Sequence, residues 1–141
     1  MIKYVLDTSA IMACYRNETG HEKVDKALAL GGCVMHVANI CEFCFSVPKK
    51  SGWTVAPDVA LAWLNRYGID GIDRMDRHIT MLAVDVRMTV PALSLGDGIA
   101  VALASTLGVP LMVAEHVFAK VNGFARIECI RKPKLKRLMP S

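Results

Sequence analysis

The sequence lacks any apolar run that approaches the roughly 18 residues of a membrane-spanning helix, although 53% of its 141 residues are hydrophobic. Its N-terminal end also lacks the pattern of a signal peptide, which is a charged segment followed by a long apolar one. The chain begins instead with a strand-like segment at residues 2–6. These absences together lead us to expect a cytoplasmic protein.

The number of cysteines is odd, which without a secretion signal favours reduced thiols over a disulfide framework. We expect the thiols to be small buried apolar residues. The pair Cys41 and Cys44 has the spacing of a zinc or redox motif, but a zinc site needs a second ligand pair, and the other cysteines are scattered along the chain. The five cysteines are Cys14, Cys33, Cys41, Cys44 and Cys129.

Other catalytic signatures are absent as well. The sequence has no Walker-type glycine-rich loop, and its four histidines show no metal-binding spacing. Asp7-Thr8-Ser9 lacks the second acid, two residues on, that haloacid-dehalogenase-type phosphatases use. We expect Trp53 and Trp63 to lie in the core or on a partner-facing surface rather than to stack on nucleic-acid bases.

The length is typical of one domain, and the positive charge is concentrated at one end. Removing five basic residues from the 17 in the chain leaves 12, against 13 acidic residues. We therefore predict one domain over 1–130 and a basic tail over 131–141, which either attracts RNA or docks an acidic partner. The five residues are Arg131, Lys132, Lys134, Lys136 and Arg137.

Short apolar segments alternate with amphipathic ones along the chain, which predicts an α/β protein with a parallel sheet. The predicted strands cover residues 2–6, 33–37, 69–72, 111–113 and 125–130, and the predicted helices cover 8–16, 21–30, 40–47, 57–67, 73–88 and 97–107.

Four acidic residues are predicted to meet at one edge of this sheet. Asp7 and Glu115 each follow a strand, while Glu42 and Asp97 lie near the starts of helices. In open parallel sheets, ligands bind beyond the carboxyl ends of the strands, where the following helices also begin. Clustered carboxylates resist ionisation unless a cation lies among them, and oxygen ligands suit Mg²⁺ or Mn²⁺. The pattern thus favours metal-assisted phosphodiester hydrolysis.

Each acid also has a structural explanation. Asp7 can cap a helix, and the spacings Asn39–Glu42 and Ser94–Asp97 both fit a capping box. Glu115 can be an ordinary surface residue.

Four segments in order resemble the acidic motifs of PIN domains, above all those of VapC-type toxins of bacterial toxin–antitoxin pairs. The first motif is similar to residues 4–11 (Tyr-Val-Leu-Asp-Thr-Ser-Ala-Ile), and the second to residues 39–43 (Asn-Ile-Cys-Glu-Phe). The third resembles residues 93–100 (Leu-Ser-Leu-Gly-Asp-Gly-Ile-Ala), and the fourth residues 111–118 (Leu-Met-Val-Ala-Glu-His-Val-Phe). Order and spacing match from residue 2 to about residue 130.

The resemblance implies a three-layer α/β/α PIN fold with a mostly parallel, short-stranded sheet. It also implies an endoribonuclease that depends on Mg²⁺ or Mn²⁺, forms a homodimer and is the toxin of a type II pair inhibited by a small antitoxin. By motif match, Asp7, Glu42 and Asp97 take the core catalytic and metal-binding roles, and Glu115 takes the fourth.

The fourth motif departs from the family pattern, which usually reads Thr-Ala-Asp with a further Asp two residues later. This chain has Val113-Ala114-Glu115 at those positions and Val117 at the later one. The loss of an acid motivates an alternative function, a PIN-like RNA-binding or scaffold module that does not cut. A receiver-like signalling domain fits less well, because no adjacent acid pair lies near the first strand.

Overall fold

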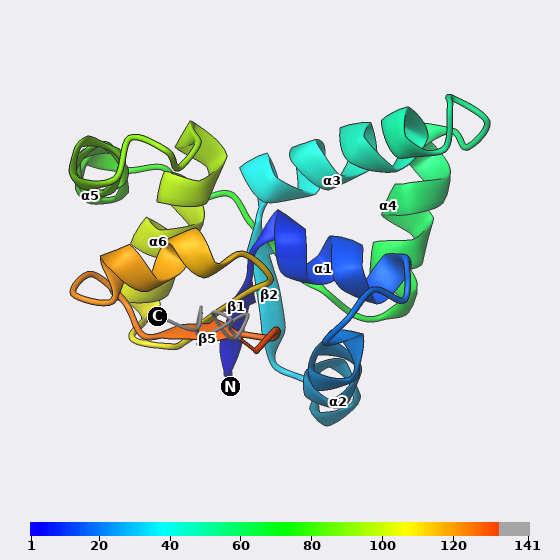
Figure 1. Ribbon diagram of the computed structural model, residues 1–141, viewed down its shortest axis with the longest axis horizontal. Coiled ribbons are helices and arrows are strands. Elements are labelled where there is room, and N and C mark those ends of the chain that lie inside the picture. The colour runs from blue at the N-terminus through cyan, green and yellow to red at the C-terminus, as the bar shows by residue number, and fades with distance from the viewer. Residues whose placement is uncertain (133–141) are drawn as a thin grey trace, which may run out of the picture.

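The computed structural model describes residues 1–132, which form a five-stranded sheet (Figure 1). All strand pairs in this range are parallel, and the order is β3-β2-β1-β4-β5. The strands are β1 (Tyr4–Leu6), β2 (Cys33–His36), β3 (Asp70–Ile72), β4 (Leu111–Val113) and β5 (Ile127–Cys129).

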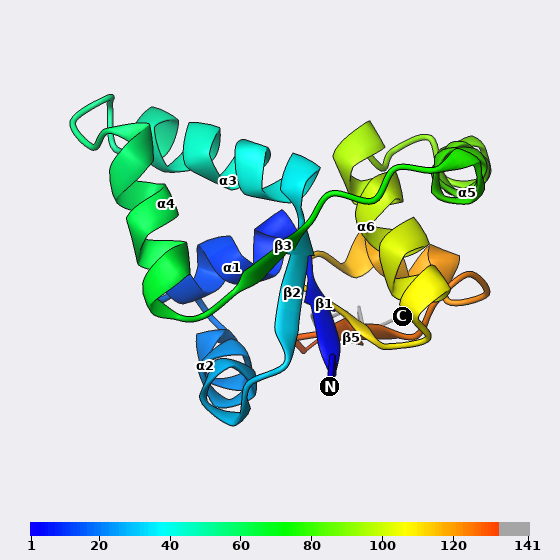
Figure 2. The same ribbon diagram turned by 180° about the vertical axis from the view of Figure 1, so that it is seen from behind.

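Helices cover both faces of the sheet because successive strand residues point to opposite sides. Leu6, Met35 and Met112 pack against the first four helices, whereas Val5, Val34 and Leu111 face the last two. The views from front and back show these helix groups on either side of the strands (Figures 1 and 2). The three-layer α/β/α prediction is confirmed. The helices are α1 (Thr8–Tyr15), α2 (His21–Leu30), α3 (Val37–Lys50), α4 (Pro57–Arg66), α5 (Arg77–Thr89) and α6 (Leu95–Leu107).

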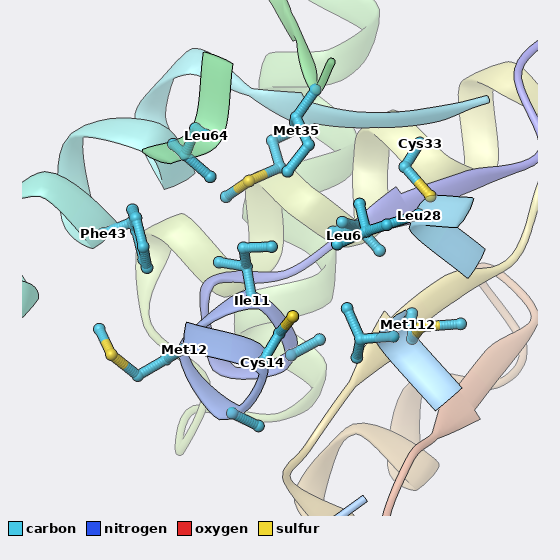
Figure 3. Packing of buried hydrophobic residues seen from close by; sticks show 14 of the residues in the cluster. Leu6, Ile11, Met12, Cys14, Leu28, Cys33, Met35, Phe43, Leu64 and Met112 are labelled. Carbon is cyan, nitrogen blue, oxygen red and sulfur yellow. The ribbon is translucent and has the colours of Figure 1, made fainter. Parts of the chain in front are cut away.

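The core on the α1 side combines sulfur-containing, aliphatic and aromatic side chains. Figure 3 shows Ile11 and Met12 of α1 beside Met35 of the sheet and Phe43 of α3. The Trp63 ring, partly buried against this cluster, lies 5.8 Å from that of Phe43 between ring centroids. The expectation of a core position is therefore confirmed for Trp63.

Three helices begin at places that the sequence pattern did not predict, and one of them, α6, starts two residues early at Leu95. α3 starts at Val37, where the His36 ring accepts a hydrogen bond from Ala38 N–H, and it continues through Pro48 to Lys50. α5 starts only at Arg77, after the Asp76 cap. A short 3₁₀ helix, η1 (His116–Val121), was not expected at all.

The thiols and the helices bear on two further expectations. All five cysteines, which lie within the described range, are free. Cys14 and Cys33 are buried as expected, but the expectation is wrong for exposed Cys41 and for half-buried Cys44 and Cys129. No helix in residues 1–132 is long and apolar enough to cross a membrane.

Candidate functional site

Asp7 lies at the carboxyl end of β1 and caps α1, so the sequence places a carboxylate where the chain leaves the sheet. Its Oδ2 accepts hydrogen bonds from Ser9 N–H at 3.0 Å and from Ser9 O–H at 2.7 Å. The side chain is only 1% exposed. Its other oxygen, Oδ1, has no hydrogen-bond partner among residues 1–132, so capping occupies only one half of the group.

The strand order places Asp7 beside the end of β4. β1 pairs with both β2 and β4, so the order reverses at this point, and such a reversal opens a crevice at the carboxyl edge. Ser9 connects the two strand ends, because its hydroxyl oxygen also accepts a hydrogen bond from Ala114 N–H at 3.0 Å. Glu115, the next residue, therefore lies at the same edge.

Asp97 and Glu42 complete the group from two helices. Asp97 forms a capping box with Ser94 at the start of α6. Ser94 N–H donates to the Asp97 carboxylate, and Asp97 N–H donates to Ser94 Oγ. The Glu42 carboxylate, from α3, lies against Gly96 so closely that a Cβ atom there would overlap it. Glycine thus lets a third carboxylate approach the first turn of α6.

The Asp97 carboxylate acts electrostatically on the other three acids. Burial and then the Asp97 carboxylate raise the pKa of Asp7 to about 7. Burial and then Asp97 also raise the pKa values of Glu42 and Glu115 above their ordinary values. Asp97 is thus the carboxylate that acts on each of the other three acids, and all four belong to the same carboxyl edge of the sheet.

Two cations oppose this repulsion at Glu115. Arg131 and Lys50 both act to lower its pKa, although burial and Asp97 outweigh them. Arg131 is held by a hydrogen bond from its Nε to the Thr19 carbonyl, at 3.1 Å, and by an ion pair with Glu18. It borders an open cleft of about 1160 Å³ that extends from Glu115 along the loop between α1 and α2.

Three residues support the site without having been singled out for it. Ser9 links two strand ends, Gly96 makes space for Glu42, and Asn39 donates from Nδ2 to the Gly96 carbonyl at 3.1 Å. The alternative in which Asn39 and Glu42 form a capping box is wrong, because His36 caps α3 and Asn39 is fully buried. A glycine directly before an acid in a first helical turn was the available signal for Gly96.

The donor set fits a hard divalent cation. Buried Asp7 presents a carboxylate oxygen without a partner in the described part of the chain, and the carboxylates of Asp97 and Glu42 both raise its pKa. Within residues 1–132, no group of three or more acidic, histidine or cysteine side chains is placed to hold a metal ion. Mg²⁺ commonly takes one or two carboxylates and fills its remaining positions with water and substrate phosphate.

Comparisons with known proteins agree with this geometry. The profile of the PIN domain family matches residues 4–123, which is most of the chain. Curated protein sequences give no significant match.

Solved structures with a similar fold include three from bacterial complexes. A chain from a DNA-bound VapBC structure of Salmonella typhimurium has a TM-score of 0.65 at 16% identity, covering 93% of this chain and 100% of that one. A toxin–antitoxin complex from Klebsiella pneumoniae gives 0.68 at 16%, over 93% and 100%. VapBC-1 from nontypeable Haemophilus influenzae gives 0.66 at 16%, over 94% and 100%. At these identities the likeness shows a shared fold.

Proposed function

Because this chain belongs to the PIN domain family, we propose that it is a Mg²⁺-dependent endoribonuclease, the toxin of a type II toxin–antitoxin pair. The observation that carries the proposal is the buried Asp7 carboxylate, which has an oxygen without a partner in the described residues and is acted on by the carboxylates of Asp97 and Glu42. Such a group is unfavourable without a cation.

Each acid has a proposed role. Asp7 and Asp97 would hold the metal, while Glu42 and Glu115 complete the acidic ring and position the attacking water. A bound Mg²⁺ supplies positive charge that polarises the phosphodiester and makes water more acidic. Ser9 keeps Asp7 oriented through two hydrogen bonds, and the capping box fixes the Asp97 carboxylate at the start of α6.

Cleavage by purified protein tests the proposal. We expect RNA to be cut in the presence of Mg²⁺ or Mn²⁺ and to stay intact with a chelator. The double variant Asp7→Asn/Asp97→Asn should fold but not cut, whereas Asp85→Asn, which changes an exposed acid on α5, should cut normally. Full cleavage by the folded double variant would contradict the proposed site.

The alternative is a PIN-like RNA-binding or scaffold module that does not cut. It is favoured by Val117, which packs against the core where the family pattern often has a further acid. Titration calorimetry separates the two functions. Absence of Mg²⁺ and Mn²⁺ binding, together with intact RNA, would favour the module.

The toxin assignment predicts a small antitoxin as a partner. It is supported by the fold likeness to chains of structures described as VapBC and toxin–antitoxin complexes. A short neighbouring gene for a DNA-binding protein, whose product co-purifies with this chain and blocks cleavage, is the expected observation. Cleavage that is unaffected by that product would argue against the pairing.

A homodimer and a separate basic tail are the remaining parts of the proposal. Met81, Val84 and Met88 on α5 are exposed apolar side chains that suit a contact with a second copy, and sedimentation velocity tests this. In the predicted tail over 131–141, Lys134, Lys136 and Arg137 lie outside the described residues. Deleting 131–141 should reduce the salt dependence of RNA binding if the tail contacts phosphates.

A further inference from the structure

The C-terminal half of α3 and the turn that follows it carry two exposed aromatic side chains. Phe45 is 56% exposed and Trp53, in the following turn, is 65% exposed. Their ring centroids lie 5.8 Å apart with the planes inclined at 65°, and the Lys49 ammonium lies 5.8 Å from the centre of the Phe45 ring. Aromatic rings and cations are thus interleaved on a surface that no other part of residues 1–132 covers.

This surface is continuous with the acidic edge. Glu42, Phe45 and Lys49 are spaced by three and four residues, so they lie on one side of α3. Glu42 and Lys49 are seven residues apart, so their backbone positions are separated by roughly 10 Å along the helix axis. Lys50, the next residue, already acts on Glu115.

The backbone holds Trp53 in an unusual conformation. Its φ of 65° is left-handed, which a side chain as large as tryptophan rarely adopts. Trp53 N–H donates to the Pro48 carbonyl at 2.8 Å, which closes the end of α3. A glycine would suit this backbone better, so local stability does not explain a largely exposed tryptophan at this position.

We propose that Phe45, Lys49, Lys50 and Trp53 form a track that binds single-stranded RNA by base stacking and leads it to the acidic edge. The proposal rests on the proposed nuclease function and adds the surface on which the RNA strand binds. Every base offers a face to an aromatic ring, and lysines attract the backbone phosphates. In a duplex, the faces of the bases are covered by their neighbours, so base-paired RNA cannot use the rings.

Charge complementarity favours RNA over a protein as the occupant. Neither lysine forms an ion pair in the described part of the chain, so both are available to phosphate. The acids themselves repel a phosphate chain, and cations on the same helix as Glu42 offset that repulsion where the RNA enters. The sequence-based assignment of Trp53 to the core or a partner-facing surface gives way, in this proposal, to an RNA-facing role.

Binding measured with a chelator present tests the track separately from cleavage. The probe is a fluorescently labelled short oligoadenylate, with and without abasic sites, and its duplex as a competitor. We expect Phe45→Ala and Trp53→Gly each to weaken binding about 5- to 100-fold, and Trp53→Phe to retain most of it. An abasic site should weaken binding to the wild type but add no loss in Trp53→Gly. Lys49→Gln and Lys50→Gln should each reduce the salt slope by about 0.7.

Controls distinguish the possible outcomes. Leu30→Ala, which changes an exposed apolar side chain on α2, and Lys26→Gln on the same helix should bind as the wild type does. Trp53→Gly should unfold at the same temperature as the wild type or higher, so that weaker binding is not caused by unfolding. Aromatic-dependent binding without any cleavage supports the track and contradicts the nuclease. Cleavage and binding that are unaffected by Phe45→Ala and Trp53→Gly overturn the track, as does a change confined to self-association.

Discussion

Two helices of this molecule begin with an aspartate cap, and the two aspartates have opposite electrostatics. Asp7 before α1 and Asp76 before α5 share an extended backbone with φ of −79°, and each accepts a hydrogen bond from a first-turn N–H. Asp76 also accepts from Arg74 Nε at 2.6 Å. Hydrogen bonds from Ile79 and then Arg74 lower its pKa, whereas burial and Asp97 raise that of Asp7 to about 7.

The difference separates capping from a site. An exposed carboxylate beside an arginine is enough to cap a helix, as Asp76 demonstrates. Asp7 performs the same capping with one oxygen but is buried among acids, which disfavours its charged form. The β1–α1 turn therefore keeps a carboxylate that local stability does not require, as expected if the charge has a chemical role.

Replacing each of the two aspartates by asparagine should produce the largest difference, which is in the rate of RNA cleavage. Asp7→Asn should lower the rate of Mg²⁺-dependent RNA cleavage by roughly 10³-fold or more, because the amide is a neutral and poorer metal ligand. Asp76→Asn should leave the rate nearly unchanged, because that residue lies before α5 with Arg74 as its partner. Single-turnover cleavage of labelled RNA measures both. Equal losses in the two variants would show that capping alone explains Asp7.

In the metal-free protein, the variant that loses most activity, Asp7→Asn, should be the more stable of the two. Unfolded Asp7 ionises near its ordinary pKa of 3.8, while folded Asp7 retains its proton up to about pH 7. Stability therefore falls as the pH rises through this window, by at most about 4 kcal/mol. Asp7→Asn removes this loss, so the variant should be more stable than the wild type at about pH 8. Asp76→Asn should be slightly less stable than the wild type.

Urea denaturation at about pH 5 and about pH 8, with a chelator, measures this effect. The wild type should lose stability between the two values, and Asp7→Asn should lose less. Adding Mg²⁺ at the higher pH should stabilise the wild type but not the variant, because ligand binding to the folded state adds stability. A wild type that is equally stable at both values would refute the raised pKa.

The sequence alone predicted the fold class, the places of Asp7 and Glu115 after strands and that of Asp97 near the start of a helix, because these features follow from local pattern. The strand over Leu111–Val113 and the helix over His21–Leu30 have the predicted bounds. The supporting residues could not be predicted in the same way. Asn39 fits a local capping box, yet its side chain bonds to Gly96, 57 positions away, and such a distant contact leaves no local signal.

The Ser9 hydroxyl connects Asp7 to the end of β4, an arrangement that Asp76 does not have. Removing this hydroxyl should therefore affect both stability and cleavage. Ser9→Ala deletes two bonds, one of which leaves the buried Ala114 N–H without its acceptor. We expect a loss of about 1–3 kcal/mol in the free energy of unfolding, together with slower cleavage. Thr80→Ala is the matched control, because that hydroxyl bonds to the Asp76 carbonyl on an exposed helix start. Equal losses in both variants would indicate that Ser9 has no special structural role.

The smallest effect is expected at Gly96, which is the second residue of α6. The second residue of α5 is the exposed His78. Alanine normally favours a helix over glycine by about 1 kcal/mol, but a Cβ atom at Gly96 overlaps the Glu42 carboxylate. Gly96→Ala should therefore be close to neutral for stability and should slow cleavage by displacing Glu42. In a Glu42→Ala background the same change should stabilise the protein by up to about 1 kcal/mol. A double-mutant cycle on unfolding free energy measures the coupling, and strictly additive effects would show that Gly96 makes no space for Glu42.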